Sequence, residues 1–274
     1  MKKQLWNDNW KFWAGGDAFA LSWNAPEDAL SVNLPHDAMI HEKPYKESPN
    51  GGNTGYRDGG YYTYAKFFEY DSSLKDKKVL VQFEGVYKDA LVFVNGDFVG
   101  KNHNGYVTFN LDITDFLQEG QNELRVQVHN GDMPNSRWYS GSGIYRDVYL
   151  LTSEGVHIEA DGVRVKTENA DSDTATVLVT SYINNDTSSK SNLSIQTSIY
   201  DALGKQLVQR TDPYVFMSNE SRSIRQRIIV PTPCLWDEEN PYLYSYQVNI
   251  VNADGAVIDS ESGSFGIRIE DIWS

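Results

Sequence analysis

The sequence predicts an all-β protein made of two consecutive β-sandwich units, and three observations support this. From Tyr61 onward, runs of residues alternate between apolar and polar with the period of two that is typical of strands. Clusters of Gly, Asn, Asp and Pro separate these runs. No long run has the period of a helix, which excludes doubly wound and barrel α/β enzymes within these residues.

Length and charge narrow the class further. The 274 residues are enough for two ordinary domains, each with its own core. The net charge of -14 weighs against a nucleic-acid partner, because phosphate binding needs clustered Lys and Arg. No apolar run approaches the ~20 residues that span a bilayer, and the first residues lack the apolar core of a secretory signal. We therefore expect a cytoplasmic protein with no membrane partner.

The first sixty residues predict irregular, turn-rich structure. Turn formers cluster at residues 14–17, 24–27 and 48–53. Between the last two clusters lies the segment Leu-Pro-His-Asp, which ends at Asp37. A loop with a buried carboxylate and a simple turn are both compatible with this segment.

Strands are predicted from Tyr61 up to the end of the first unit. The run at 90–94 is continuously apolar, as for a strand buried on both faces, and the Asn95-Gly96 pair after it predicts a hairpin. Only residues 114–118 suggest a helical turn. The predicted strands are 61–70, 79–84, 90–94, 107–113, 124–129 and 148–151.

Residues 135–147 form a segment of distinctive composition near the end of the first predicted unit. Two arginines, three aromatic residues and two glycines stand between strand-like runs, a composition that suits a shaped loop. Residues 152–155 form a linker after the next strand. We therefore predict one domain at 1–153 and a second at 154–274.

The second domain contains about seven short strands over roughly 110 residues, with turn signals every ~8 to 12 residues. This pattern predicts an immunoglobulin-like sandwich, without the paired cysteines of antibody domains. The predicted strands are 156–160 with 163–167, 175–183, 193–199, 205–209, 223–230, 244–251 and 257–265.

The residues show no self-sufficient catalytic site. A Gly-x-Ser-x-Gly elbow is absent, and neither the five histidines nor the single Cys234 has metal-ligand spacing. The adjacent acids at 27–28 and 237–239 do not form a convincing acid and nucleophile pair. We expect no catalytic residue, metal or cofactor here. The 13% aromatic content suits β-sandwich cores and also surfaces that stack on sugars.

Several segments together resemble the N-terminal region of glycoside hydrolase family 2, which includes β-galactosidases, β-glucuronidases and β-mannosidases. They occur in the family's order and cover nearly the whole chain. Ala38, where the family often has an aromatic residue, is a departure that weakens any subfamily assignment. The segments are 34–37 (Leu-Pro-His-Asp), 61–68, 83–86, 94–96, 99–100, 105–109, 112–114, 135–148, 235–236, 239–244 and 265–268 (Phe-Gly-Ile-Arg).

The resemblance implies a jelly-roll domain of the sugar-binding (galactose-binding-like) type, then an immunoglobulin-like sandwich, then a TIM barrel with two catalytic glutamates. In the family the Phe-Gly-Ile-Arg segment directly precedes the barrel, so we expect the barrel to be missing from these residues. The implied partners are this barrel and a β-galactoside, because the Asn-Ser-Arg-Trp-Tyr-Ser-Gly form looks more like β-galactosidases than glucuronidases. The glycone and any homo-oligomer stay open.

The resemblance also implies roles for two groups of residues. Asp37 and Arg146 are expected to form a largely buried structural ion pair. The loop 135–139 is expected to complete a sugar site on the barrel, or alternatively to pack between domains. In the sugar-site hypothesis, hydroxyl contacts come from Asn135 and Arg137 and an aromatic wall from Trp138 and Tyr139.

Two functions follow as expectations. The first is a non-catalytic N-terminal region of a retaining β-glycosidase, most simply a β-galactosidase, inactive without its barrel. The second is an independent carbohydrate-binding module. A β-glucuronidase or β-mannosidase parent remains an alternative within the first.

Overall fold

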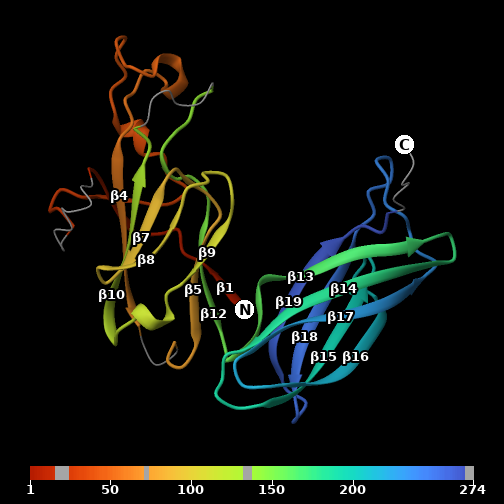
Figure 1. Cartoon of the computed structure of the whole chain (residues 1–274). Helices are drawn as coiled ribbons and strands as arrows, with labels where there is room; N and C mark the ends of the chain where they lie inside the picture. The colour runs from red at the N-terminus through yellow and green to blue at the C-terminus, as the bar shows by residue number, and fades with distance from the viewer. Residues whose placement is uncertain (16–24, 71–73, 132–137, 269–274) are drawn as a thin grey trace. The chain divides into compact units, whose positions relative to one another are not determined.

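A computed structural model describes residues 1–15, 25–70, 74–131 and 138–268. The chain divides into two compact units: Lys2–Thr152 form the first, and Ser153–Ser274 with Met1 form the second. Both units consist of antiparallel sheets, so the all-β prediction is confirmed (Figure 1). Within the described ranges, no helix is long and apolar enough to cross a membrane.

The first unit is a sandwich of two main sheets and a short two-stranded ribbon. The six-stranded sheet has the order β3 (Leu30–Val32), β2 (Trp10–Ala14), β4 (Tyr61–Tyr70), β10 (Gly120–His129), β7 (Ala90–Val94) and β8 (Asp97–Asn102). The four-stranded sheet has the order β1 (Lys2–Leu5), β12 (Val148–Ser153), β5 (Lys78–Phe83) and β9 (Phe109–Asp112). The ribbon pairs β11 (Gly143–Ile144) with β6 (Val86–Tyr87).

The core of the first unit follows from the two-residue period of its strands. Alternate residues of each strand face the opposite sheet, so that Trp10, Phe83 and Leu124 are fully buried in one apolar cluster. The predicted hairpin forms between β7 and β8, where Asn95 and Gly96 both have positive φ, as a type I′ turn requires.

Two sequence predictions for this unit are wrong in detail. The first sixty residues contain three short strands, β1 to β3, whose three to five residues are too few to show a clear period. Strand β7 is fully buried on one face only, because its intervening residues Leu91 and Phe93 lie on the partly exposed side of the sheet.

The second unit is a seven-stranded sandwich of the predicted immunoglobulin-like type. One sheet has the order β13 (Val156–Ala170), β14 (Thr174–Asn185) and β17 (Glu220–Pro231). The other has the order β16 (Gln206–Phe216), β15 (Ser191–Tyr200), β18 (Tyr244–Asn252) and β19 (Val257–Phe265). Strand β16 continues past its predicted end, and its Pro213 is tolerated because β16 is an edge strand.

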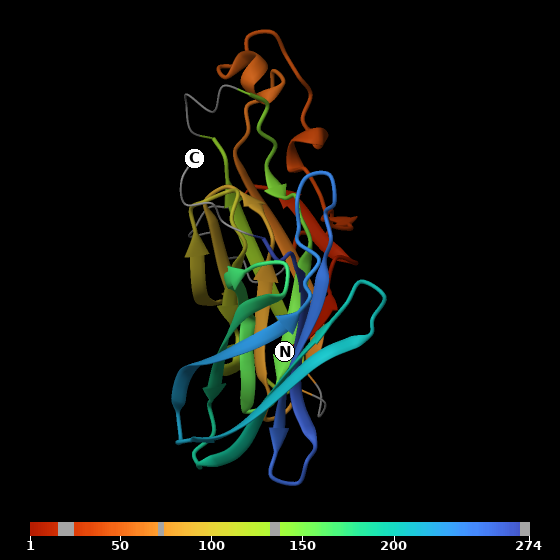
Figure 2. The ribbon, with the colours of Figure 1, turned by 90° about the vertical axis from the view of Figure 1, so that its right-hand side faces the viewer.

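Loops gather at one end of the first unit and define its most irregular surface. Two short 3₁₀ helices, η1 (Ala38–His41) and η2 (Gly51–Thr54), lie in the long connection between β3 and β4. The segment 138–144 runs beside this connection, as both ribbon views show (Figures 1 and 2). These two segments are far apart in sequence, and their contact positions the candidate site.

Candidate functional site

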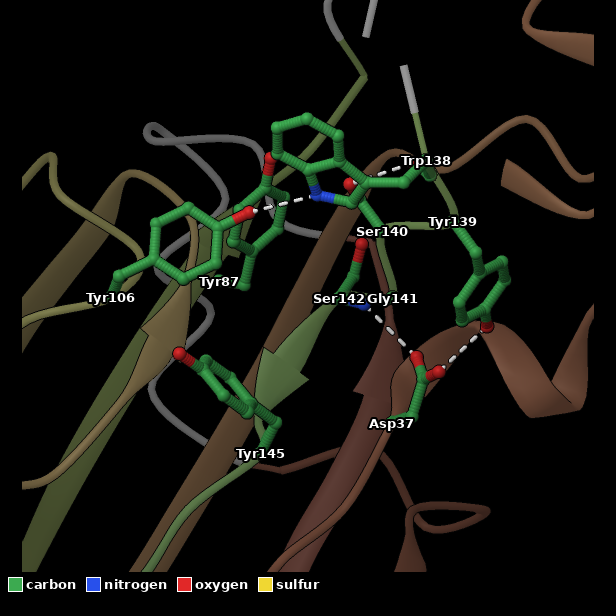
Figure 3. Close-up of a pocket in the computed structure, with 9 residues that line it drawn as sticks. All are labelled: Asp37, Tyr87, Tyr106, Trp138, Tyr139, Ser140, Gly141, Ser142 and Tyr145. Carbon is green, nitrogen blue, oxygen red and sulfur yellow. Dashed lines mark hydrogen bonds between the residues drawn. The ribbon is translucent and has the colours of Figure 1, made fainter. Parts of the chain in front are cut away.

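A pocket of about 350 Å³ lies where segment 138–144 meets η1. Its lining combines one carboxylate with five aromatic rings and a stretch of small residues (Figure 3). The lining residues are Asp37, Tyr87, Tyr106, Trp138, Tyr139, Ser140, Gly141, Ser142 and Tyr145.

Asp37 links the two segments through its carboxylate. Oδ1 accepts hydrogen bonds from the backbone N–H of Ser142, at 2.9 Å, and of Met39, at 3.0 Å, so that Asp37 also caps η1. Oδ2 accepts the Tyr139 hydroxyl at 2.7 Å (Figure 3). The backbones run together as well, since Ala38 N–H donates to the Ser142 carbonyl and His36 N–H to that of Ile144.

Other contacts fix segment 138–144 from its remaining sides. The Ser140 N–H donates to the Asn53 carbonyl at 3.1 Å. The fully buried Asn130 amide donates to the Gly141 carbonyl at 3.0 Å and to the Ser142 hydroxyl at 2.8 Å. A Cβ at position 141 would lie 2.4 Å from Asp37 Oδ2, so only glycine allows this approach. The small residues of the pocket are therefore held rigidly by backbone contacts.

The aromatic residues form the walls. Trp138 is 62% exposed and Tyr106 is 54% exposed, and the Trp138 indole N–H donates to the Tyr106 hydroxyl at 3.4 Å (Figure 3). Tyr87 packs edge-on against Tyr106 with ring centroids 5.4 Å apart, and the Tyr145 hydroxyl donates to the Gly105 carbonyl at 2.7 Å. The open side of the pocket thus presents flat apolar surfaces with polar edges.

Burial and the Asp37 carboxylate keep the Tyr139 hydroxyl protonated. Burial, followed by the hydrogen bond to Asp37, raises the pKa of Tyr139 to about 12. None of the described residues that line the pocket is a Lys, Arg or His. Asp37 is the single carboxylate among the described lining residues, so this lining favours a neutral or cationic ligand over an anion.

Three of the predicted site residues come together here. Asp37, Trp138 and Tyr139 all line the pocket. Asn135 and Arg137 lie outside the described residues. Among the described residues, no group of three or more His, Cys, Asp or Glu has the arrangement of a metal site.

The predicted ion pair between Asp37 and Arg146 is not formed by these two described residues. Arg146 is exposed, and its guanidinium lies 5.4 Å from the ring centroid of Tyr145. The chain bends at Arg146 between β11 and β12, which turns the side chain to solvent, and neutral donors satisfy Asp37 instead. Asp37 therefore joins the two loop segments through these neutral donors and not through an ion pair with Arg146.

Sequence reasoning missed Tyr87, Tyr106 and Tyr145 as wall residues. They lie in separate loops and short strands, and no local period relates them. Two glycines could have indicated the packed rings of Tyr87 and Tyr145. A Cβ on Gly105 would lie 2.3 Å from the Tyr87 ring, and a Cβ on Gly85 would lie 2.8 Å from the Tyr145 ring. A glycine near an aromatic residue can mark close ring packing.

Comparison with known proteins assigns both units. Residues 52–154 match the model described as "Glycosyl hydrolases family 2, sugar binding domain", and residues 156–268 match "Glycosyl hydrolases family 2". Among curated proteins, the chain is 32% identical over 264 residues to beta-galactosidase BoGH2A of Bacteroides ovatus, covering 96% of this chain and 31% of that protein. It is 29% identical to a beta-glucuronidase of Formosa agariphila, covering 78% of this chain and 24% of that protein.

Solved structures give the same result. A glycosyl hydrolase family 2 member from Bacteroides cellulosilyticus is 32% identical with a TM-score of 0.90, covering 97% of this chain and 35% of that one. A beta-glycosidase from Bacteroides vulgatus is 28% identical with a TM-score of 0.86, covering 97% and 34%. The chain therefore spans about a third or less of the length of the proteins it resembles here.

Gly143 offers a test of the packing beneath the pocket. Its φ is +118°, and an added Cβ would lie 2.2 Å from the hydroxyl of the fully buried Tyr64. We expect Gly143→Ala to lower the free energy of unfolding by about 2 to 4 kcal/mol in urea denaturation, because both the backbone and the ring must shift. The control Gly52→Ala, which has open space, should be close to neutral; equal stabilities of the two variants would contradict this packing.

The Asp37–Tyr139 hydrogen bond contributes to the raised pKa of Tyr139. We expect Asp37→Asn to lower the pKa of Tyr139 from about 12 toward the ordinary tyrosine value of about 10, while burial keeps part of the shift. Carbon-13 NMR of the tyrosine Cζ atoms, with Tyr139→Phe for assignment, measures this. Asp58→Asn, which alters the carboxylate that accepts the Tyr45 hydroxyl, is the matched control and should leave Tyr139 unchanged. The same Tyr139 titration in both variants would rule the coupling out.

Proposed function

Because this chain belongs to glycosyl hydrolase family 2, we propose that it is the non-catalytic N-terminal region of a retaining β-glycosidase, and that this enzyme is a β-galactosidase. In this proposal the catalytic glutamates lie on a barrel that follows residue 274, and the present residues contribute part of the substrate-site rim. The family assignment rests on both units, and the curated relatives named above include a beta-galactosidase and a beta-glucuronidase.

The observation that carries the proposal is the pocket built around Asp37. A carboxylate has about four lone-pair positions, and three of them are used by Met39, Ser142 and Tyr139. One position is left to accept a sugar hydroxyl. The rings of Trp138 and Tyr106 are exposed beside it and offer flat faces to the apolar side of a pyranose.

The charge of the pocket favours a galactoside over a glucuronide. Recognition of a uronic acid needs a cation near its carboxylate, as Arg supplies through paired hydrogen bonds. The described lining residues contain no cation, and Asp37 would repel a second carboxylate. A neutral glycone suits this lining better.

An independent carbohydrate-binding module is the second candidate. The observation that favours it is the exposure of Trp138 and Tyr106, which could act as a stacking platform without any further domain. The two candidates differ in whether the 274 residues bind sugar unaided.

Activity and binding of the 274-residue protein separate these candidates. We expect no hydrolysis of a nitrophenyl β-galactoside, since the retaining mechanism needs two carboxylates and Asp37 is the single one among the described residues that line the pocket. Calorimetry with galactose or lactose should show no binding if the region is accessory, whereas millimolar or tighter binding would favour the module. Robust turnover by purified protein would overturn the first candidate.

Trp138 tests whether the pocket belongs to the substrate site of the complete enzyme. We expect Trp138→Ala in the full-length gene product to raise the KM for a nitrophenyl β-galactoside about 10-fold, the loss of roughly 1.4 kcal/mol of stacking, with an unchanged Tm. Phe98→Ala, an exposed ring of the same unit outside the pocket, should change neither. A lower Tm with an unchanged KM would instead indicate that Trp138 packs between domains.

A further inference from the structure

Two imidazoles lie behind the pocket, in contact with each other. Nε2 of the half-buried His36 is 3.0 Å from Nε2 of the exposed His41, and Nδ1 of His36 is 2.7 Å from the Tyr64 hydroxyl. The His41 ring stacks on Phe12 of β2 with ring centroids 5.2 Å apart. We call His36 and His41 the histidine pair.

The contact between the two Nε2 atoms needs a single proton. At 3.0 Å one Nε2 donates its N–H and the other accepts it, so the contact is a hydrogen bond as long as one of the two atoms is unprotonated. Nδ1 of His36 lies at the same time against the Tyr64 hydroxyl, at 2.7 Å.

Protonation of both rings breaks this contact. Each Nε2 then carries a proton, and two N–H groups of like charge face each other. Acid therefore exchanges an attractive contact at 3.0 Å for a repulsive one.

The groups around the pair do not compensate fully. Asp37 on the same loop favours a charged imidazole, but burial and then the neighbouring His41 dominate and lower the pKa of His36. On β4, Tyr62 stays protonated because burial raises its pKa, and its hydroxyl is bound by Glu42, which follows η1. Strand β2 contributes only the uncharged ring of Phe12.

The histidine pair brackets Asp37 in sequence and is tied to the same backbone. His36 lies one residue before Asp37, and His41 is the last residue of η1, the 3₁₀ helix that Asp37 caps. The N–H of His36 donates to the Ile144 carbonyl at 2.8 Å, next to the Ser142 N–H that Asp37 accepts. Separation of the two rings would displace the residues on both sides of Asp37.

We propose that the histidine pair is an acid-sensitive clasp: while one of the two Nε2 atoms is unprotonated it holds the Asp37 segment against the pocket, and when both rings are protonated it releases that segment. The direction follows from linkage. A histidine whose pKa is lowered in the closed form binds more protons in the open form, so the closed form is fully stable above the ordinary histidine value of about 6.5 and weakens as the pH falls below it.

Hydrogen exchange measured by mass spectrometry tests the clasp in the 274-residue protein. Exchange is compared at about pH 7.5 and about pH 5, after correction for intrinsic rates. We expect peptides covering residues 36–42 and 138–144 to exchange about fivefold faster or more at the lower pH, while a peptide within β10 does not change. His157, whose pKa burial also lowers, lies in the second unit and is not part of these peptides.

Two substitutions of the same type make the result specific. His41→Gln keeps an oxygen that accepts the His36 proton but cannot become charged, so the like-charge contact cannot form and the acid-induced loss of protection should become much smaller, while burial of His36 keeps part of it. His103→Gln changes an exposed histidine of the same unit that pairs with Asp89, and it should keep the full loss. The clasp is overturned if the wild type shows no acid effect at the two peptides or if His41→Gln retains the effect in full.

An NMR measurement on the wild type checks the arrangement independently. Long-range proton–nitrogen spectra of the imidazoles should show His36 neutral at about pH 7.5 and charged at about pH 5. A His36 ring that stays neutral at about pH 5 while the two peptides lose protection would overturn the clasp.

Discussion

The end of the first unit depends on the hydrogen bonds of one carboxylate. Asp37 accepts donors from Met39, Tyr139 and Ser142, so a single side chain joins two segments that are about a hundred residues apart in sequence. A partly buried carboxylate is tolerable only when its lone pairs are satisfied. Because two of these donors are backbone N–H groups, the carboxylate fixes the path of the chain as well as one side chain.

This constraint explains the glycines and the amide beneath the pocket. Gly141 must lack a side chain for Asp37 to reach Ser142. Gly143 must lack one for the Tyr64 hydroxyl to pack against it. Asn130 supplies the donors that the backbone of this segment still needs. The aromatic side chains of the pocket therefore pack beside a segment whose backbone is fixed, and Trp138 and Tyr106 keep exposed faces.

Elements with a long, one-sided burial pattern could be predicted from the sequence. Strands β14 and β17 bury every second residue over most of their length, and all seven strands of the second unit overlap their predicted ranges. The geometry of the site could not be predicted in the same way. The donors to Asp37 and the wall residue Tyr106 come together only through long-range packing, which no local period encodes.

The proline in β16 affects whether this edge of the second unit can pair with strands of other chains. An unpaired strand edge is a template for strands of other chains, and proteins commonly guard against such addition. Pro213 removes a donor from this edge, and the exposed Arg210 places charge beside it. A strand from another chain is therefore less able to extend the four-stranded sheet of the second unit at β16.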